Sequence, residues 1–320
     1  MEFGSERIPR SVLRKDSVVK FGMSCMKTSP SQALKGALWM ISSAVFFSLM
    51  SLLVRIASQV QGINTWITTE FRFLIGIAVV LAISAWKHDP LRFVNRRWLI
   101  SRGLFGGAAV SIYFYSIAEI GIAKAAIFTY SYPLWAGLLA PLLFRERINL
   151  GVWAAIVAAF GGLYLIIVPP EGLGSTSWMD LLGLSSGLLT GWAILSIKKL
   201  HETDTSRAIF FSQCFFGLII VVIPAQSGGY SFPAMGWITL LAVGLLAAVA
   251  QLQMTYAYKF IGATEGSLLS MLTPVLNVVL GLFFLHEPVT TRSLIGCIIV
   301  LASCAYASVP QQNPQSGGGG

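Results

Sequence analysis

The sequence predicts an all-α integral membrane protein whose ten transmembrane helices form a 5+5 inverted repeat. Three observations lead to this fold class: a composition rich in apolar residues, apolar stretches of membrane-spanning length, and an internal repeat at one fixed offset. Of the 320 residues, 55% are apolar and 11% are charged, whereas soluble domains carry about 25% charged residues. So few polar side chains cannot solvate a whole protein surface, which excludes an ordinary soluble enzyme, a disordered protein and a nucleic-acid-binding protein.

Apolar stretches recur along the chain from residue 34 onward and are separated by short polar breaks. A helix of about 20 residues is needed to cross a hydrocarbon core of roughly 30 Å. The breaks at residues 86–90, 144–148 and 198–204 carry charges that the centre of a bilayer would reject. The ten predicted spans cover residues 34–57, 64–86, 97–117, 122–144, 149–169, 179–199, 207–225, 233–258, 266–285 and 290–309.

The spans group into two units of five. The first unit is expected at residues 34–169 and the second at residues 179–309, joined by an outer linker at residues 170–178. Residues 1–33 form a predicted basic cytosolic tail without an apolar run long enough for a signal peptide. Residues 310–320 are predicted to be a tail or linker.

The positions of Lys and Arg predict the orientation in the membrane. With the N-terminus placed in the cytosol, 18 of the 22 Lys and Arg residues fall on the inner side. Arg55, Lys124 and Arg292 fall on the outer side, and Arg72 lies within a span. This asymmetry follows the positive-inside rule, so both termini are predicted to be cytoplasmic, in a bacterial inner membrane. It also accounts for the net charge of +9 without a nucleic-acid partner.

The sequence matches itself without gaps at an offset of 141 residues. At this offset Gly121, Pro133 and Glu146 fall on Gly262, Pro274 and Glu287, Tyr115 falls on Tyr256, and Gly76 falls on Gly217. Coincidence of Gly, Pro and Glu at two fixed spacings indicates a duplication. Because each unit holds an odd number of spans, the second unit is expected to lie upside down relative to the first. Inverted repeats are typical of transporters that work by alternating access.

Two features carry a resemblance to a known family. They are Arg72-Phe73 in the second span, and Gly, Pro and Glu separated by 11 and 12 residues through the fourth and ninth spans. The chain thereby resembles the drug/metabolite transporter superfamily, specifically its EamA-type ten-helix exporters and metabolite carriers, over residues 34–309. The resemblance implies a central cavity between two inverted five-helix units. The chain departs from the pattern at residues 145–147 and at Gln213, where a perfect repeat would place a second Arg. Members carry chemically different metabolites, so the resemblance does not name the cargo.

The predicted function is that of a secondary transporter, which moves a small polar metabolite across the cytoplasmic membrane by alternating access. The expected cargo is amino-acid-like, or an organic anion or zwitterion. The alternative is an uptake or exchange carrier for S-adenosylmethionine-like or nucleotide-type metabolites. More distant alternatives are a non-transporting membrane scaffold and an intramembrane serine protease, because residues 183–187 match GxSxG. Gly183, Gly187 and Gly191 recur every four residues, which favours a helix-packing seam over a nucleophile turn.

Polar and aromatic residues within the spans are the candidates for binding a substrate. Arg72 lies about eight residues inside its span, where it contacts either a substrate anion or, alternatively, backbone carbonyls or Glu70. Amide side chains beside it suit a zwitterion or weak acid, with interhelical hydrogen bonding as the alternative. The aromatic side chains either line an amphipathic pocket or pack the helices. The predicted substrate-binding residues are Arg72, Tyr113, Tyr130, Trp192, Gln213, Gln251, Tyr256 and Asn277.

Hinge and gate candidates lie at matched places in the two units. Pro133 and Pro274 fall inside the fourth and ninth spans, where each removes a backbone hydrogen bond. Matched breaks in two halves favour a hinge or binding site over tolerated kinks. Glu146 and Glu287 end the same spans and are gate candidates, with a structural role as the alternative. Lys124 is expected at the outer mouth, where it attracts anions or contacts lipid phosphate.

The sequence predicts no cofactor and no metal site. Its three His and four Cys residues lie far apart and lack the spacing of a zinc site. It also lacks a P-loop pattern, which excludes an intrinsic ATP motor. The predicted partners are a small-molecule substrate and membrane lipid, and the sequence leaves a monomer and a homodimer open.

Overall fold

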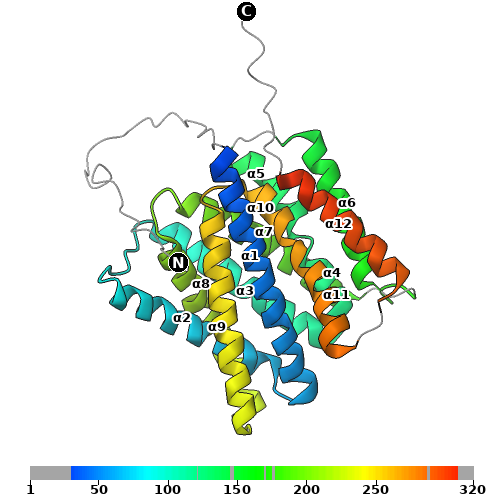
Figure 1. The fold of residues 1–320 in the computed structure, drawn as a ribbon. Helices are drawn as coiled ribbons and strands as arrows, with labels where there is room; N and C mark the ends of the chain where they lie inside the picture. The colour runs from blue at the N-terminus through cyan, green and yellow to red at the C-terminus, as the bar shows by residue number, and fades with distance from the viewer. Residues whose placement is uncertain are drawn as a thin grey trace, which may run out of the picture.

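A computed structural model of the protein describes residues 30–120, 122–144, 148–168, 171–174, 177–286 and 289–308. Regular structure in these residues is helical throughout (Figure 1). The first half contains α1 (Pro30–Arg55), the short π-helical segment η2 (Ile56–Val60), α2 (Thr65–Trp86), α3 (Arg96–Ile120), α4 (Ile122–Thr129), α5 (Tyr132–Phe144) and α6 (Leu150–Ile167). The second half contains α7 (Trp178–Leu200), α8 (Ser206–Ala225), the 3₁₀ turn η3 (Gln226–Gly228), α9 (Ala234–Ala257), α10 (Ala263–Ser270), α11 (Leu272–Leu285) and α12 (Thr291–Ser308).

Most of these helices can cross a bilayer. Within the described residues, eight helical segments are long and apolar enough to do so, and Thr291–Ala307 is a shorter apolar helix. Two of the eight segments, Lys124–Phe144 and Ala263–Leu285, each join two helices. The helix α3, which has three arginines among its first seven residues, is not one of the eight. The predicted all-helical membrane protein is therefore confirmed, and a total of ten spans stays a prediction.

Polar residues between the apolar stretches fix where several helices begin. The side-chain oxygens of Asn64 and Asn149 accept backbone hydrogen bonds at the starts of α2 and α6, over 2.8 and 3.0 Å. Ser177 and Asp180 form a capping box at the start of α7, and Thr205 caps α8. Each cap satisfies a backbone N–H that has no partner inside its helix. The polar breaks of the sequence therefore coincide with helix ends.

The fourth and ninth predicted spans are each divided into two helices. Two residues separate α4 from α5, and one residue separates α10 from α11. Pro133 is the second residue of α5, and Pro274 is the third residue of α11. In the first turn of a helix the missing N–H of proline costs no intrahelical hydrogen bond. Each proline therefore lies at the start of a new helix, and the regular helix of each span is interrupted for one or two residues just before it.

The helix boundaries repeat with the same offset as the sequence. The helices α10 and α12 begin and end 141 residues after α4 and α6, respectively. Equivalent residues also join α2 to α8, because the Phe73 ring lies against Gly217 and the Cys214 sulfur lies against Gly76. A Cβ atom at Gly217 would lie only 2.5 Å from the Phe73 ring, and a Cβ atom at Gly76 only 2.6 Å from the Cys214 sulfur. Glycine at these two positions allows α2 and α8 to approach closely.

The helices of the two halves interleave. The helix α3 packs on α7 and α8, and α9 packs on α1 and α2, which are the corresponding helices of the other half. The repeat-related helices α6 and α12 pack on each other. Figure 1 shows the first turn of α1 and the last turn of α12 at the same end of the bundle. Contacts between the halves therefore occur in repeat-related pairs around the centre of the molecule.

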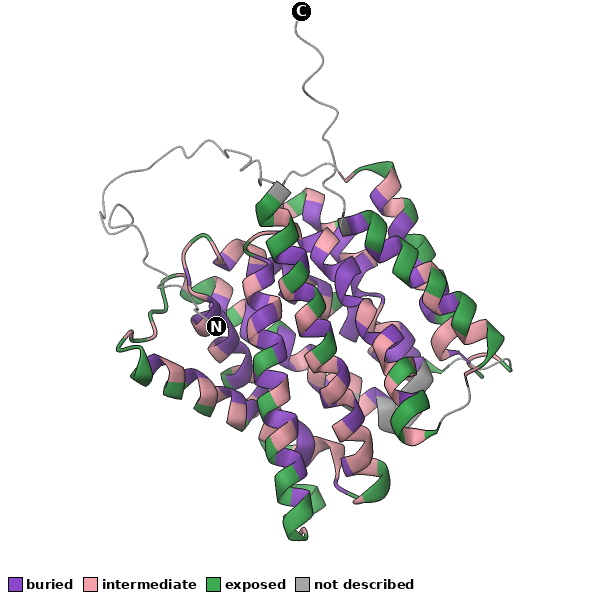
Figure 2. Cartoon of the chain, in the orientation of Figure 1, coloured by how far each residue is buried: buried purple, intermediate pink, exposed green. Residues whose placement is uncertain are grey.

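The outer surface of the bundle is apolar. Buried residues lie mainly on the inward sides of the helices, and exposed residues follow their outer sides (Figure 2). Leu142, Leu150 and Ile223 are 78%, 82% and 78% exposed, and many other large apolar side chains share such positions. A continuous apolar exterior is unfavourable in water, but it is the expected contact surface for lipid tails.

Candidate functional site

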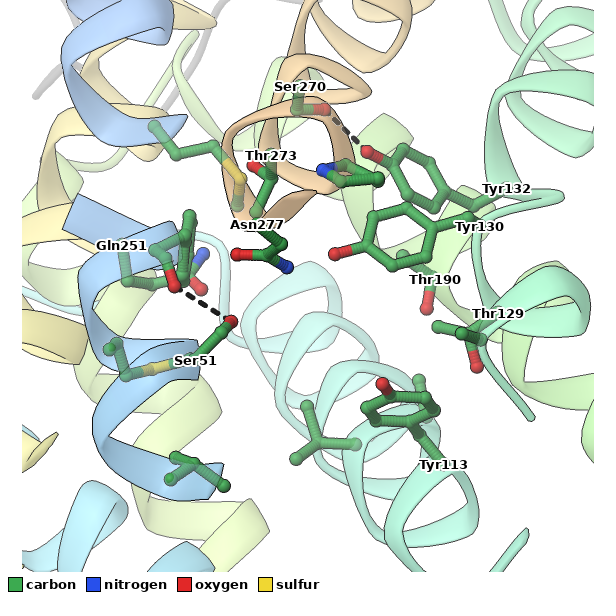
Figure 3. A pocket seen from close by; sticks show the side chains of 18 of the residues that line it. Ser51, Tyr113, Thr129, Tyr130, Tyr132, Thr190, Gln251, Ser270, Thr273 and Asn277 are labelled. Atoms are coloured by element: carbon green, nitrogen blue, oxygen red, sulfur yellow. Dashed lines mark hydrogen bonds between the residues drawn. The ribbon is translucent and has the colours of Figure 1, made fainter. Parts of the chain in front are cut away.

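A cavity of about 490 Å³ lies between the two halves of the bundle. It is lined by residues of α1 to α11 with polar groups distributed among apolar ones, and Figure 3 shows part of this lining. Its volume falls within the range of about 300–1,000 Å³ that is typical of small-molecule pockets. This cavity is the candidate functional site.

Arg102 and Gln213 form a buried polar pair in the wall of the cavity. Nη2 of Arg102, on α3, donates a hydrogen bond to Oε1 of Gln213, on α8, over 2.7 Å. Arg102 is 3% exposed and Gln213 is 4% exposed. Gly106, one turn after Arg102, leaves the space that the guanidinium fills, because a Cβ atom there would collide with Nη1. The pair therefore holds a cation at a defined place in the wall.

Arg72 is the second cation of the wall, and it is held differently. Within the described part of the chain, its guanidinium makes no hydrogen bond and no ion pair; Cζ lies 5.9 Å from the centroid of the Phe47 ring. Glu70, the alternative partner, accepts a hydrogen bond from the hydroxyl of Tyr230 over 2.7 Å. The Arg72 donors are thus available to a molecule inside the cavity.

The charged groups around the cavity are all positive. Arg55, Arg72 and Arg102 line it, and its described lining contains no Asp or Glu. Cations at membrane depth are costly, and they are characteristic of substrate and ion pathways. The cavity therefore has a positive potential that favours an anion.

Part of the cavity wall is polar and uncharged. Among the described residues, Oδ1 of Asn277 and Nε2 of Gln251 are buried atoms without a hydrogen-bond partner. Figure 3 shows the side chain of Asn277 and the hydroxyl of Tyr130 directed toward each other. The hydroxyl groups of Tyr132 and Ser270 lie 2.5 Å apart at the cavity edge. These groups can donate and accept hydrogen bonds to an uncharged part of a ligand.

Six of the eight predicted binding residues line this cavity, namely Arg72, Tyr113, Tyr130, Gln213, Gln251 and Asn277. The other two lie elsewhere. The indole of Trp192 stacks on Trp98 at 5.9 Å and donates to Oγ of Ser101 over 2.8 Å. The ring of Tyr256 packs edge-on against Trp39, with 5.4 Å between centroids.

The predicted hinge and gate residues are also distributed. Pro274 lines the cavity, whereas Pro133 is buried within α5 outside the lining. Glu146 and Glu287 lie outside the described residues. The breaks before the two prolines place Tyr130 and Ser270 next to the cavity.

The predicted role of Lys124, to attract anions or contact lipid phosphate, does not fit the structure, because this side chain is paired. Its Nζ lies 2.8 Å from Oδ2 of Asp180, and both side chains are buried. The same Oδ2 accepts a hydrogen bond from the backbone of Ser177 over 2.9 Å. This ion pair connects α4 to the start of α7. The two residues are 56 positions apart, so the sequence gives no local signal for their pairing.

Sequence reasoning missed several lining residues, of which Arg102 is the most important. The others bring hydroxyl groups to the wall and are Ser51, Thr129, Tyr132, Thr190, Ser270 and Thr273. The count of basic residues by side places Arg102 among the 18 Lys and Arg residues of the inner side, so it is not a candidate for binding. Its position five residues inside the predicted span 97–117 was the available signal, because a cation there must reach protein or water.

The cavity extends toward one end of the bundle. Its lining includes the last residues of α1 and α6, such as Arg55 and Ile167. At the other end, Nζ of Lys198 donates to the Ile261 carbonyl over 3.0 Å. Nε2 of His201 donates to the Thr255 carbonyl over 2.6 Å. These contacts tie the end of α7 to the end of α9 and the following turn, and they close that end.

Burial lowers the pKa of His201 to about 4, and the nearby positive charges of Lys259 and Lys198 act in the same direction. A carbonyl oxygen can only accept a hydrogen bond, so Nε2 carries the hydrogen in this contact. His201 is therefore neutral at physiological pH and forms a neutral hydrogen bond at the closed end.

The GxSxG match is part of a helix seam. Oγ of Ser185 donates to the carbonyl of Leu182 over 2.6 Å within α7. Gly187 lies against Ser131. A Cβ atom added at Gly191 would lie 2.9 Å from Cβ of Trp135. Small residues on α7 therefore allow it to pack closely on the region between α4 and α5.

Comparison with known proteins defines the class. The EamA-like transporter family matches the chain twice, over residues 34–168 and 177–309. The chain therefore belongs to the EamA-like transporter family, which confirms the predicted resemblance. It is an integral membrane transporter of small molecules, and its family consists of transporters rather than enzymes.

Individual relatives agree with this assignment over most of their length. The pseudopaline exporter CntI of Pseudomonas aeruginosa is 27% identical over 278 residues, covering 85% of this chain and 95% of that protein. A riboflavin transporter of Rhizobium johnstonii is 30% identical over 294 residues, covering 87% and 92%. Human solute carrier family 35 member G1 is 23% identical over 311 residues, covering 89% and 83%. A solved crystal structure shares the fold, with a TM-score of 0.72, 18% identity and coverage of 87% of this chain and 97% of that one.

Proposed function

We propose that the protein is a ten-helix secondary transporter that moves a small organic anion or zwitterion across the bacterial cytoplasmic membrane by alternating access. The two family matches and the 141-residue offset between helix boundaries support two units with the same fold. An odd number of spans in each unit would invert one relative to the other. The cavity would then lie between two halves that rock against each other.

The observation that carries this proposal is the state of Arg72. Its guanidinium is unpaired within the described residues, and it faces a cavity whose described lining contains no acidic residue. Such a group binds a carboxylate or phosphate through charge-assisted hydrogen bonds. It repels a cation, which argues against an S-adenosylmethionine-like cargo with a sulfonium. A nucleotide-type cargo remains compatible with it through its phosphate.

The orientation follows from the excess of Lys and Arg on one side of the spans. With both termini in the cytoplasm, the end of α1 that carries Arg55 would face outward. The cavity would then be open toward the outside and closed toward the cytoplasm by the contacts of Lys198 and His201. Alternating access would require those contacts to break while the outer end closes.

The test is transport by the purified full-length protein in proteoliposomes. The panel contains labelled glutamate, succinate and ribose 5-phosphate, together with riboflavin because one relative is a riboflavin transporter. We expect uptake or exchange of at least one anion or zwitterion above the rate of protein-free vesicles. Transport confined to cations or uncharged solutes would overturn the proposal, as would the absence of transport under an imposed cargo gradient.

A further inference from the structure

Building on the proposed transport of an anion, we propose that the cavity selects a dianionic metabolite, either a dicarboxylate or a phosphate monoester, by engaging Arg72 and Arg102 together. The proposed function requires only one anionic group and one cation. The selection for two negative charges is the additional claim.

The first argument is the charge balance of the wall. Of the three arginines in the lining, Arg55 lies at the end of α1 and has contacts of its own. Arg72 and Arg102 bring two further positive charges to the cavity, and no acidic residue in its described lining compensates them. A guanidinium cannot lose its proton to escape the cost of burial. A monoanion would leave one of the two charges uncompensated, whereas a dianion compensates both.

The second argument is the number of unused donors. A guanidinium has five N–H donors. Within the described residues, Arg102 uses one of them, from Nη2 to Gln213, and its Nε is buried without a partner. None of the five N–H donors of Arg72 is used within the described residues. A carboxylate or phosphate can accept two parallel hydrogen bonds from such a group.

The third argument comes from the broken symmetry of the repeat. Gln213 occupies the position equivalent to Arg72 in the second unit. A second Arg at this place would repel Arg102, whereas the amide oxygen of Gln213 accepts a hydrogen bond from it. Gly106 leaves the space in which the Arg102 guanidinium lies. The departure from the repeat therefore positions the Arg102 cation instead of adding another arginine beside it.

The uncharged polar part of the wall suits the rest of such a molecule. Asn277, Gln251 and Tyr130 present amide and hydroxyl groups without charge. Because no carboxylate joins them in the described lining, this wall offers no counter-ion to an ammonium group. A body with hydroxyl, keto or amide groups matches it better than a zwitterion does.

Matched ligands test the claim on the unmodified protein. Binding of succinate is compared with binding of its monoamide, succinamate, by thermal shift and calorimetry of the purified full-length protein. Binding of ribose 5-phosphate is compared in the same way with that of its methyl phosphodiester, which carries one negative charge. We expect at least one dianion to bind about tenfold or more tightly than the matched ligand of lower charge. A tenfold difference is the expected effect of losing one charged contact. The succinate pair reports two separated charges, and the phosphate pair reports two charges on one group.

Equal binding within both pairs, or binding of none of the four, overturns the selection for two charges. Glutamate, glutamine and butyrate complete the panel, because they carry one net negative charge or none. Arg72-dependent binding and transport of one of these, without any preference for a dianion, would leave the proposed function intact while rejecting this inference. Absence of transport for every ligand would reject both.

Variants then test the role of Arg102. In R102Q the affinities for the dianion and for its matched ligand of lower charge are expected to differ by no more than about twofold. The control is R97Q, which makes the same change on an exposed residue of the same helix outside the cavity. If R102Q does not fold, G106A displaces the guanidinium without removing the charge and is expected to weaken the same preference. A full preference retained in folded R102Q, or in folded G106A, overturns the inference.

Discussion

Nη2 of Arg102 donates a hydrogen bond to Oε1 of Gln213 over 2.7 Å, and this bond joins α3 of the first half to α8 of the second. Both side chains are almost completely buried. A buried charged group that loses its partner still has the free-energy cost of desolvation but no longer has the stabilising hydrogen bond. The pair therefore stabilises the contact between the halves as well as the position of the cation.

Replacement of Gln213 by Leu is expected to destabilise the folded protein by about 1.5–3 kcal/mol, the contribution of a hydrogen bond to a charged group. The melting temperature of the detergent-solubilised protein measures this effect. Gln226→Leu is the control, because Gln226 is exposed and its hydrogen bond to Tyr230 lies at the surface. Equal melting temperatures of the two variants would contradict a stabilising role for the Arg102–Gln213 pair.

Replacement of Arg72 by Ala is expected to reduce transport while leaving the stability of the folded protein nearly unchanged. Its guanidinium makes no hydrogen bond or ion pair within the described residues, so the melting temperature of the variant should change little. Anion transport should fall about tenfold or more, because a charge-assisted contact with the cargo is lost. Transport kinetics in proteoliposomes measure the loss. Unchanged kinetics would contradict the role of Arg72, and loss of folded protein would indicate a structural role instead.

Much of the fold could be predicted from sequence because length and hydropathy decide which segments can cross a bilayer. The fourth span shows how far this reasoning reaches. Pro133 predicted a disturbance there, but the two-residue interruption between α4 and α5 depends on the local backbone hydrogen bonds of Tyr130 and Ser131, which the position of the proline does not specify. A count of ten spans also requires knowledge of depth in the membrane, which helix bounds alone do not supply.

The cavity was harder to predict because hydropathy does not specify the rotation of a helix about its axis. Gln213 and Asn277 are polar in apolar surroundings, and both face the cavity. Trp192 and Tyr256 are amphipathic, so they can face either a cavity or a neighbouring helix, and they pack on Trp98 and Trp39. Aromatic residues thus carry less positional information than amides and cations at the same depth.

Lys124 and Asp180 provide a third prediction. Removing one partner of a buried ion pair leaves the other charge uncompensated, so Lys124→Met should destabilise the protein by about 3–5 kcal/mol. The double variant Lys124→Met/Asp180→Asn removes both charges and should regain part of that loss. Melting temperatures of the single and double variants give the comparison. A double variant less stable than Lys124→Met would show that the pair does not act through charge compensation.

His201 predicts how stability depends on pH. Burial lowers the pKa of this side chain to about 4 in the folded protein, while an exposed His in the unfolded chain has a pKa near 6.5. Above pH 6.5 both states are neutral, and the hydrogen bond from His201 to Thr255 is present. Below that pH the unfolded state binds a proton that the folded state resists. The free energy of unfolding therefore decreases as pH falls from about 6.5 to 4, by at most about 3 kcal/mol.

Melting temperatures recorded between pH 7 and pH 4.5 measure this decrease, and His201→Gln isolates the part that belongs to His201. Glutamine can still donate to the Thr255 carbonyl but does not titrate, so the pH dependence should be shallower in this variant. His88→Asn is the control, because His88 is exposed, whereas His201 is hydrogen-bonded to the Thr255 carbonyl. The backbone of His88 has φ of 50°, a conformation that Asn tolerates well. The same slope in His201→Gln and in the unmodified protein would mean that His201 is already solvated in the folded state, and that the closed end is not sealed by this contact.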